Sequence, residues 1–202
     1  MIGFFGGSFD PVHYGHLLTA RAIKQELGLD KLFLMPCNPV HKSSLFFSDK
    51  QRLEMLNLAL NEFADLSLDR REINSSTPSY SIDTLRQIKQ KYPNKKIFFI
   101  IGGDSFAALD TWKNYQQLSQ FAQLVVLPRK GADLHSESKV YFAKTPLVEA
   151  SSTQIRKILF ELNCKNKRPN FEQFSANLSA LTPDSIIRYL YENPVTTAKT
   201  DC

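Results

Sequence analysis

The sequence contains little cysteine and lacks any long apolar run. Its 202 residues include only three cysteines, Cys37, Cys164 and Cys202. An odd number without regular spacing argues against a disulfide framework and for a reducing compartment. No apolar run approaches the roughly 20 residues that span a bilayer, and Met1 leads into a strand-like run without the features of a signal peptide. We therefore expect a soluble, cytoplasmic protein without a membrane partner.

The sequence also lacks a block of basic residues. Its net charge of +5 comes from lysines and arginines scattered along the chain, which favours a small anionic substrate over a nucleic-acid partner. A hydrophobic content of 43% suffices for one sizeable core. The expected organisation is one domain over residues 1–193, followed by a disordered tail at 194–202. No stretch of the sequence indicates an oligomeric state.

Short apolar runs rich in β-branched and aromatic residues alternate with segments of helical period. The runs predict buried strands at 1–5, 31–36, 96–101 and 123–128. Strand followed by helix, repeated, indicates parallel pairing with right-handed crossovers. We therefore expect an α/β fold, a single Rossmann-like doubly wound domain with a mainly parallel central sheet and helices on both faces.

Helix boundaries are marked by capping signals. A stripe from Leu17 to Leu27 ends before Gly28, a C-terminal cap. A capping box of Ser48 and Gln51 precedes Leu53, Leu56 and Leu60, and N-cap residues at 151–153 precede a stripe from Ile155 to Leu162. The polar stretch 163–179 reads as a connection to a last helix that begins near Thr182 and stops before Pro194.

The unusual stretches of the sequence all follow predicted strands. They are GGSFDPVHYGH, CNPVHK, GGDS and PRKG, and in an open parallel sheet the carboxyl ends of the strands line the ligand-binding edge. The first stretch opens a helix, whose N-terminus favours phosphate. It lacks the GxGxxG and Walker patterns, so His13 and His16 would take the place of the Walker lysine.

Two other interpretations of this stretch remain open from the residues alone. The glycine pair and the two histidines could be purely structural, since neutral histidines satisfied by the backbone are common. Alternatively, His13, His16, Cys37 and His41 could bind zinc, although their spacing matches none of the usual structural patterns. The spacing does not decide between them.

The stretch GGSFDPVHYGH resembles the first signature of the HxGH nucleotidyltransferase superfamily, and SSTQIR at 151–156 resembles its second. The resemblance implies adenylyl or cytidylyl transfer from a nucleoside triphosphate, with pyrophosphate leaving. It implies catalytic roles for His13, His16 and Arg156. The ATP-binding residues that it implies are Gly6, Gly7, Phe9, His13, His16, Ser151, Ser152, Thr153 and Arg156.

Further stretches are similar to loops of bacterial nicotinate-mononucleotide adenylyltransferases. They are CNPVHKSSLFFSDKQRLEML with its His-Lys pair and Arg52, TPSYSIDTL at 77–85, and IGGDSFAALDTWKNY at 101–115. The implied acceptor is nicotinate mononucleotide, and the product is nicotinate adenine dinucleotide. Mg²⁺ would arrive with ATP, and the sequence shows no dedicated carboxylate cage for a metal. The acceptor-binding residues implied are Ser8, Lys42, Thr84, Asp104, Trp112, Lys113 and Arg129.

Several of these residues also have simpler interpretations. Trp112, the only tryptophan, could stack on a pyridine ring or anchor a core. Asp104 could accept hydrogen bonds from ribose hydroxyls or cap a helix that starts at Ser105. Lys42 and Arg129 could neutralise phosphates or be solvated surface charges. A phosphopantetheine adenylyltransferase and a non-catalytic nucleotide sensor on the same fold are the alternative functions, with a zinc hydrolase as a third.

Overall fold

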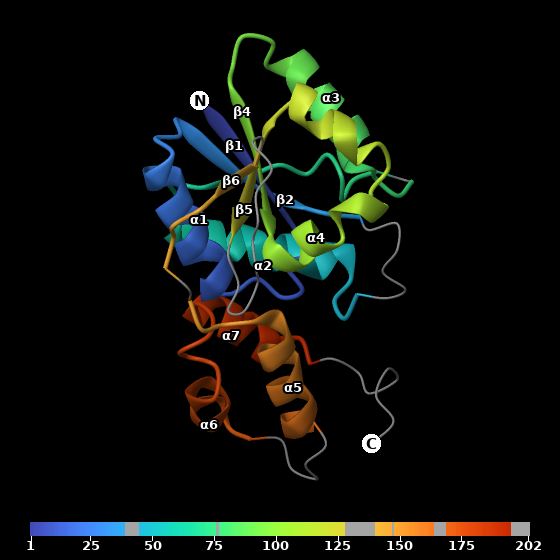
Figure 1. Ribbon diagram of the computed structural model, residues 1–202. Coiled ribbons are helices and arrows are strands. Elements are labelled where there is room, and N and C mark those ends of the chain that lie inside the picture. The colour runs from blue at the N-terminus through green and yellow to red at the C-terminus, as the bar shows by residue number, and fades with distance from the viewer. Residues whose placement is uncertain (39–44, 76, 128–139, 147, 164–168, 195–202) are drawn as a thin grey trace.

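The computed structural model describes residues 1–38, 45–75, 77–127, 140–146, 148–163 and 169–194, and within them the chain builds one parallel sheet (Figure 1). The strand order is β3-β2-β1-β4-β5-β6, and every neighbouring pair is parallel. This order reverses direction between β1 and β4, where a doubly wound sheet opens its ligand crevice. The strands are β1 Ile2–Gly7, β2 Lys31–Pro36, β3 Ser67–Leu68, β4 Ile97–Gly102, β5 Gln123–Leu127 and β6 Val140–Phe142.

Helices cover both faces of the sheet, as the strand-helix alternation predicts. They are α1 Tyr14–Glu26, α2 Asp49–Glu62, α3 Ser81–Lys91, α4 Gly103–Ala107, α5 Ser152–Asn163, α6 Phe171–Ala176 and α7 Asp184–Glu192, with short 3₁₀ turns η1 Leu109–Thr111 and η2 Tyr115–Gln120. The period of two along β1 separates two cores. Phe5 packs with α1 and α2 on one face, whereas Ile2 and Phe4 pack with α3 on the other. The expected doubly wound α/β fold is confirmed.

The C-terminal helices lie beyond the carboxyl ends of the strands. In Figure 1, α5, α6 and α7 gather below the sheet, on the side to which the carboxyl ends of the strands point. Ile155 of α5 and Ile186 of α7 belong to the same hydrophobic cluster as Leu17 of α1 and Phe5 of β1. The two sequence motifs, far apart along the chain, therefore meet at one edge of the sheet.

The predicted capping signals are present. Gly28 has a φ of +58°, in the left-handed region that glycine adopts without a steric penalty, and it follows α1. The Ser48 side chain accepts from the Gln51 N–H while the Gln51 side chain accepts from the Ser48 N–H, which completes the capping box of α2. The Ser151 hydroxyl accepts from the Gln154 N–H at the start of α5.

Two local expectations differ from the structure. The buried face of α2 includes Arg52, Met55 and Ala59 beside Leu56, whereas Leu53 and Leu60 are only partly buried. An arginine occupies this face because its guanidinium has partners there, described below. The stretch 163–179, expected to be a connection, contains α6, which Asn170 caps and which buries Phe174. A helix of six residues is too short to show a clear period.

Other elements carried too little signal to be predicted. The edge strands β3 and β6 have two and three residues, fewer than a periodic pattern needs. The resemblance of TPSYSIDTL is to a loop of the family, yet α3 begins within this stretch at Ser81. The tail expected at 194–202 lies outside the described residues except for Pro194.

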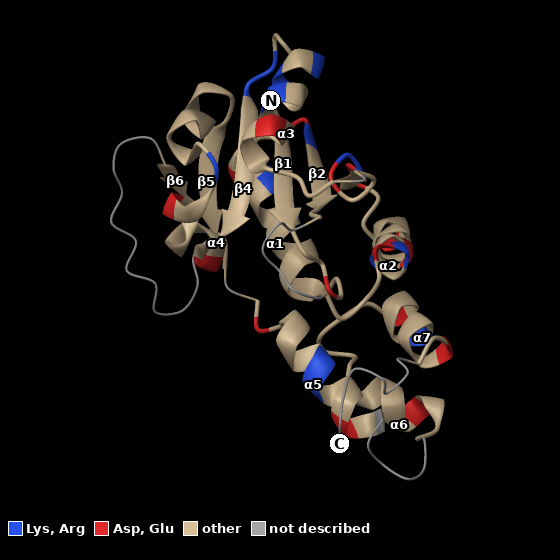
Figure 2. Ribbon diagram, turned by 90° about the vertical axis from the view of Figure 1, so that its right-hand side faces the viewer, with Lys and Arg blue, Asp and Glu red and all other residues tan. Residues whose placement is uncertain are grey.

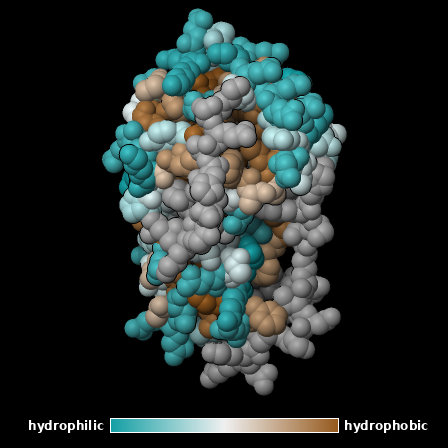
Figure 3. Space-filling view, in the orientation of Figure 1, coloured by the Kyte–Doolittle hydropathy of each residue, from teal (hydrophilic) through white to brown (hydrophobic). Residues whose placement is uncertain are grey.

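The surface shows mixed charge. Both basic and acidic residues lie on α2 and on α7 (Figure 2), in line with the scattered charges of the sequence. On the face seen in Figure 3, hydrophilic residues cover the upper end, and hydrophobic ones are visible nearer the middle. Within the described ranges, no helix has both the length and the apolar character that crossing a membrane requires.

Candidate active site

His13 and His16 form a close pair of tilted rings at the N-terminus of α1. His13 is the N-cap residue, and its carbonyl accepts from the N–H groups of His16 and Leu17. The two imidazole centroids are 3.8 Å apart with an interplanar angle of 35°, and His13 is only 6% exposed. Phe9 supports the pair, because its ring centroid lies 4.8 Å from that of His16. The imidazoles are thus held in a fixed orientation at a helix start, where the dipole favours anions.

Gly15 is required between the two histidines by close packing. A Cβ at this position would lie 2.6 Å from the Ala150 carbonyl oxygen and 2.7 Å from Cε1 of His13. Both distances are far below van der Waals contact. Glycine therefore lets the segment before α5 approach the histidine pair directly.

Phe9 belongs to the core rather than to the surface of the site. Its side chain is 1% exposed and its φ is +47°, in the left-handed region that disfavours a bulky residue. Its ring packs edge-on against Phe5 at 5.8 Å. A ligand at this loop would meet the backbone of Phe9, while the buried ring supports His16.

Three consecutive carbonyls of the first loop accept hydrogen bonds from the C-terminal part of the chain. Arg156 Nη1 donates to the Asp10 carbonyl at 2.6 Å, and Ser152 Oγ donates to the Pro11 carbonyl at 2.9 Å. The Val12 carbonyl accepts from Thr182 Oγ1 at 3.1 Å. The structure therefore joins GGSFDPVHYGH to SSTQIR, as the sequence required of a shared site. Arg156 also donates to Thr153 Oγ1 and stays partly exposed.

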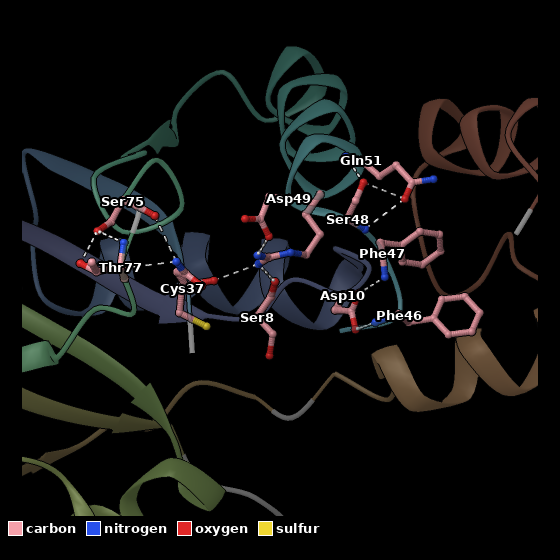
Figure 4. A network of polar contacts seen from close by, with 12 residues as sticks. Ser8, Asp10, Cys37, Phe46, Phe47, Ser48, Asp49, Gln51, Ser75 and Thr77 are labelled. Carbon is pink, nitrogen blue, oxygen red and sulfur yellow. Dashed lines mark hydrogen bonds and ion pairs between the residues drawn. The ribbon is translucent and has the colours of Figure 1, made fainter. Parts of the chain in front are cut away.

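Asp10 holds the segment before α2, a role that the sequence did not reveal. Its two carboxylate oxygens accept from the backbone N–H groups of Phe47 and Phe46 at 2.8 and 2.9 Å (Figure 4). The side chain is buried, and Arg156 Nη1 lies 3.8 Å from Oδ2. Hydrogen bonds to an ionised acceptor are among the stronger ones in proteins. Asp10 therefore fixes the first loop, α2 and Arg156 relative to one another.

Arg52 links the loops that follow β1 and β2. Its guanidinium donates to the Ser8 carbonyl at 2.8 Å and to the Cys37 carbonyl at 3.1 Å, and it pairs with Asp49 at 2.7 Å (Figure 4). The side chain is 0% exposed. The family resemblance included Arg52 in a stretch of sequence but gave it no role, and only the fold shows that it is buried between two loops.

Asn38 extends this network to the segment before α3. Its side-chain amide donates to the Ser75 carbonyl at 3.2 Å, and the backbone carbonyl of Asn38 accepts from the Ser79 N–H. Ser75 and Cys37 both lie in the close-up of Figure 4. The loops after β1, β2 and β3 are thereby tied together at the carboxyl edge of the sheet.

Two of the expected acceptor-binding residues lie on the other face of the sheet. Trp112 follows η1, is partly exposed, and packs against the core of α3, with its ring centroid 6.4 Å from that of Phe99. Lys113 donates to Asp83 Oδ2 at 3.0 Å and lies 4.5 Å from the Tyr80 ring centroid. These contacts bring the Trp112 loop to the N-terminus of α3, one residue from Thr84.

The remaining expected residues are placed as follows. Thr84 is buried in the first turn of α3. Asp104 is exposed in the first turn of α4, which begins at Gly103 with Gly102 as its N-cap, so the interpretation of Asp104 as the cap of a helix starting at Ser105 is wrong. Lys42 and Arg129 lie outside the described residues, as does His41 of the zinc hypothesis. Within the described part of the chain, no three His, Cys, Asp or Glu side chains form a group that could hold a metal.

The sequence and fold both agree with a known class of protein. A family model described as cytidylyltransferase-like matches residues 4–158, which include both histidines and the start of α5. The fold is also found in a Plasmodium falciparum nicotinic acid mononucleotide adenylyltransferase solved in complex with NaAD, with a TM-score of 0.76 and 19% identity over 95% of this chain and 94% of that one. The chain is a nucleotidyltransferase of the cytidylyltransferase-like class.

Relatives of higher sequence identity identify the family within this class. The chain is 44% identical over 199 residues to a Vesicomyosocius okutanii protein named "probable nicotinate-nucleotide adenylyltransferase", covering 94% of this chain and 93% of the relative. It is 37% identical over 194 residues to the nicotinate-nucleotide adenylyltransferase of Bacillus subtilis, covering 95% and 96%. The chain belongs to the nicotinate-nucleotide adenylyltransferase family.

Proposed function

We propose that this protein transfers the adenylyl group of ATP to nicotinate mononucleotide, giving nicotinate adenine dinucleotide and pyrophosphate. The observation that carries the proposal is the junction of the two motifs. The first-loop carbonyls of Asp10 and Pro11 accept from Arg156 and Ser152. The start of α5 is therefore attached to the loop that leads into the histidine pair. Membership of the nicotinate-nucleotide adenylyltransferase family supports the same reaction.

The proposed chemistry needs positioning rather than a general base. The attacking oxygen belongs to the 5′-phosphate of nicotinate mononucleotide, which is already anionic at neutral pH. The barrier then depends on alignment with the α-phosphorus and on stabilising charge over the transferring group. His13 and His16 would donate to the ATP phosphates, with His16 near the α-phosphate. Their close, tilted arrangement, with His13 buried and His16 partly buried, limits the reorganisation that this requires.

The departing pyrophosphate would be held by the start of α5. Ser151, Ser152 and Thr153 lie at its N-terminus, where backbone N–H groups and the helix dipole favour an anion. Arg156 adds a charged fork that matches phosphate oxygens. Imidazole, hydroxyl and guanidinium donors suit phosphate oxygens better than a cation. Mg²⁺ would therefore be coordinated by phosphates and water, where it neutralises phosphate charge.

The nicotinate end of the acceptor would bind between α3 and η1. The Trp112 indole is partly exposed beside Phe99 and could stack on the pyridine ring for roughly 0.5–1.5 kcal/mol beyond area burial. Thr84 and the backbone of Trp112 and Lys113 would hold the carboxylate. Asp104 would accept from ribose hydroxyls, and Ser8, Lys42 and Arg129 would contact the acceptor phosphate side.

The test is pyrophosphate release from purified protein with ATP and Mg²⁺. Nicotinate mononucleotide, nicotinamide mononucleotide and phosphopantetheine are compared at equal concentration. We expect release dominated by nicotinate mononucleotide. Dominant release with phosphopantetheine would assign the alternative adenylyltransferase activity, and ATP binding without release for any acceptor would indicate a nucleotide sensor.

A further inference from the structure

Charged and polar side chains attach the tryptophan segment, residues 112–117, to the first two turns of α3. Lys113 Nζ donates to Asp83 Oδ2 at 3.0 Å, and Arg86 Nη2 donates to Gln117 Oε1 at 3.0 Å. Arg86 Nη1 also donates to Asp83 Oδ1 at 3.2 Å. Each oxygen of the Asp83 carboxylate therefore accepts from a different cation, one in the tryptophan segment and one on its own helix.

These contacts act on both ends of the tryptophan segment. The side chains of Lys113 and Asp83 are about half exposed, so their ion pair alone contributes little. Lys113 follows Trp112 directly, however, whereas Gln117 lies in η2 at the end of the segment. Lys113 Nζ also lies 4.5 Å from the ring centroid of Tyr80, the N-cap residue of α3, a favourable cation–π geometry. Two separate points of the segment are thus fixed to one helix.

The backbone around Trp112 is a pair of short turns. Trp112 is extended, with φ −80° and ψ 139°, and joins η1 to η2, while Asn114 is left-handed with φ +52°. Turns of the 3₁₀ type have poorer hydrogen-bond geometry than an α-helix. The indole is partly exposed and packs beside Phe99. Its orientation therefore depends on the contacts that hold the chain on either side of it.

An aromatic side chain that is fixed before its ligand arrives binds that ligand at a lower entropic cost. We propose that Asp83 is a positioning residue for the acceptor. Through Lys113 and Arg86 it fixes the tryptophan segment on α3, so that the indole of Trp112 is in place before nicotinate mononucleotide binds. The inference rests on the proposed function, since it takes Trp112 as the surface on which the pyridine ring stacks. Asp83 acts through Trp112 and not on the reacting phosphate, so its effect falls on acceptor binding.

Tryptophan fluorescence of the protein without substrate provides the first test. Trp112 is the only tryptophan of the chain, so its emission reports on this segment alone. Acrylamide quenching and fluorescence anisotropy are measured for the wild type and for Asp83→Asn. We expect the quenching constant to rise about twofold in the variant, because exposed ion pairs shift equilibria by only a few-fold, and the anisotropy to fall.

The salt dependence of the same signals tests the electrostatic origin of the effect. Salt screens exposed ion pairs. Raising NaCl from about 0.05 M to about 1 M should therefore move the quenching constant of the wild type toward that of Asp83→Asn. The constant of the variant itself should change little over the same range.

Asp30→Asn is the matched control. Asp30 is also an exposed carboxylate between two cations, the N-terminal amine of Met1 and Lys95 Nζ. It lies just before β2, at the amino ends of the strands, whereas the proposed active site lies at their carboxyl ends. Fluorescence and kinetics of this variant should match the wild type.

Substitutions of Lys113 identify the partner through which Asp83 acts. Lys113→Met removes the cation and should reproduce the fluorescence of Asp83→Asn, whereas Lys113→Arg keeps a cation and should behave as the wild type. Combining Asp83→Asn with Lys113→Met should change the quenching constant by less than the two single effects together, because both remove the same contact.

Steady-state kinetics connect the segment to the acceptor. In Asp83→Asn, KM for nicotinate mononucleotide should rise about threefold to tenfold, the effect of losing two exposed ion pairs. Its kcat and its KM for ATP should stay within about twofold of the wild-type values. Thermal melts show that each variant is folded.

The outcomes distinguish the inference from the proposed function. Wild-type quenching and anisotropy in Asp83→Asn would overturn the inference and leave the reaction intact. Altered fluorescence with an unchanged KM for nicotinate mononucleotide, or with equal losses for both substrates, would overturn the positioning role as well. Absence of turnover with nicotinate mononucleotide in the wild type would contradict the proposed function itself, and the positioning role would fall with it.

Discussion

Arg156 Nη1 donates to the carbonyl of Asp10 at 2.6 Å, although 146 residues separate them. The same nitrogen lies 3.8 Å from the Asp10 carboxylate. This carboxylate also accepts hydrogen bonds from the backbone N–H groups of Phe46 and Phe47, just before α2. A residue of the first motif therefore positions the guanidinium of the second. In the proposed mechanism this arginine holds the leaving group, and its orientation is set before any nucleotide binds.

Replacing His16 by alanine should lower kcat by about 10²–10³, the cost of removing one donor to a developing charge. The imidazole is supported by Phe9 and by His13, so the loss should appear in turnover more than in folding. Steady-state kinetics with ATP and nicotinate mononucleotide test this. His16→Gln, which keeps an N–H donor, should retain more activity, and a near-normal rate for His16→Ala would refute the mechanism.

Trp112→Ala should raise KM for nicotinate mononucleotide and leave KM for ATP nearly unchanged. The lost stacking is worth roughly 0.5–1.5 kcal/mol beyond the lost area, which corresponds to at least a few-fold in KM. Trp112→Phe keeps an aromatic face against Phe99 and serves as the matched control. Equal losses for both substrates would mean that Trp112 acts as a core anchor.

Arg52→Met should destabilise the protein. Methionine keeps a long unbranched apolar side chain at this position but removes the donor groups of the guanidinium. The carbonyls of Ser8 and Cys37 would each lose a donor in a buried place, which costs at least about 2 kcal/mol in total. The melting temperature should then fall by about 4–8 °C. Lys50→Met, on the same helix with an exposed ion pair to Glu54, is the control and should change little. Similar melting temperatures for the two variants would contradict the role of Arg52.

Gly15→Ala should impair both stability and turnover. The added methyl group would meet the Ala150 carbonyl and the His13 ring at under 3 Å, so the helix start or α5 must move. Gly102→Ala is matched in chemistry, but its Cβ would have nothing within 4 Å, and its melting temperature should be unchanged or slightly higher. Calorimetry of both variants gives their melting temperatures. A melting temperature of Gly15→Ala equal to that of the wild type would show that the packing around Gly15 is looser than described.

Stability should depend on Tyr189 in alkaline solution. The phenol donates to Glu54 Oε2 at 2.6 Å between α7 and α2, and burial, followed by this hydrogen bond, raises the pKa of Tyr189. A raised pKa means that the stabilisation is complete below the unfolded value of about 10 and is lost as the pH rises above it. Above about pH 10 the wild type should lose stability more steeply than Tyr189→Phe. Parallel curves in thermal melts would exclude this contribution.

The sequence predicted the parts of the site that have a local signature. Gly15 and the histidine pair lie within eleven residues, and capping signals marked the starts of α2 and α5. The roles of Arg52 and Asp10 could not be predicted in this way, because their partners are mainly backbone carbonyls and amides on other segments of the chain. Arg52 in particular falls on the buried face of a helix, where a period-based reading expects leucine. Only the three-dimensional arrangement shows why a charged residue belongs there.

The hydrogen bonds to the carbonyls of residues 10–12 also set an order of events during protein synthesis. The first loop is synthesised well before its carbonyl partners Ser152, Arg156 and Thr182. Neither proposed phosphate subsite can reach its final form until synthesis has passed Thr182. A chain truncated before Thr182 would therefore contain both signature motifs and still lack a finished nucleotide site.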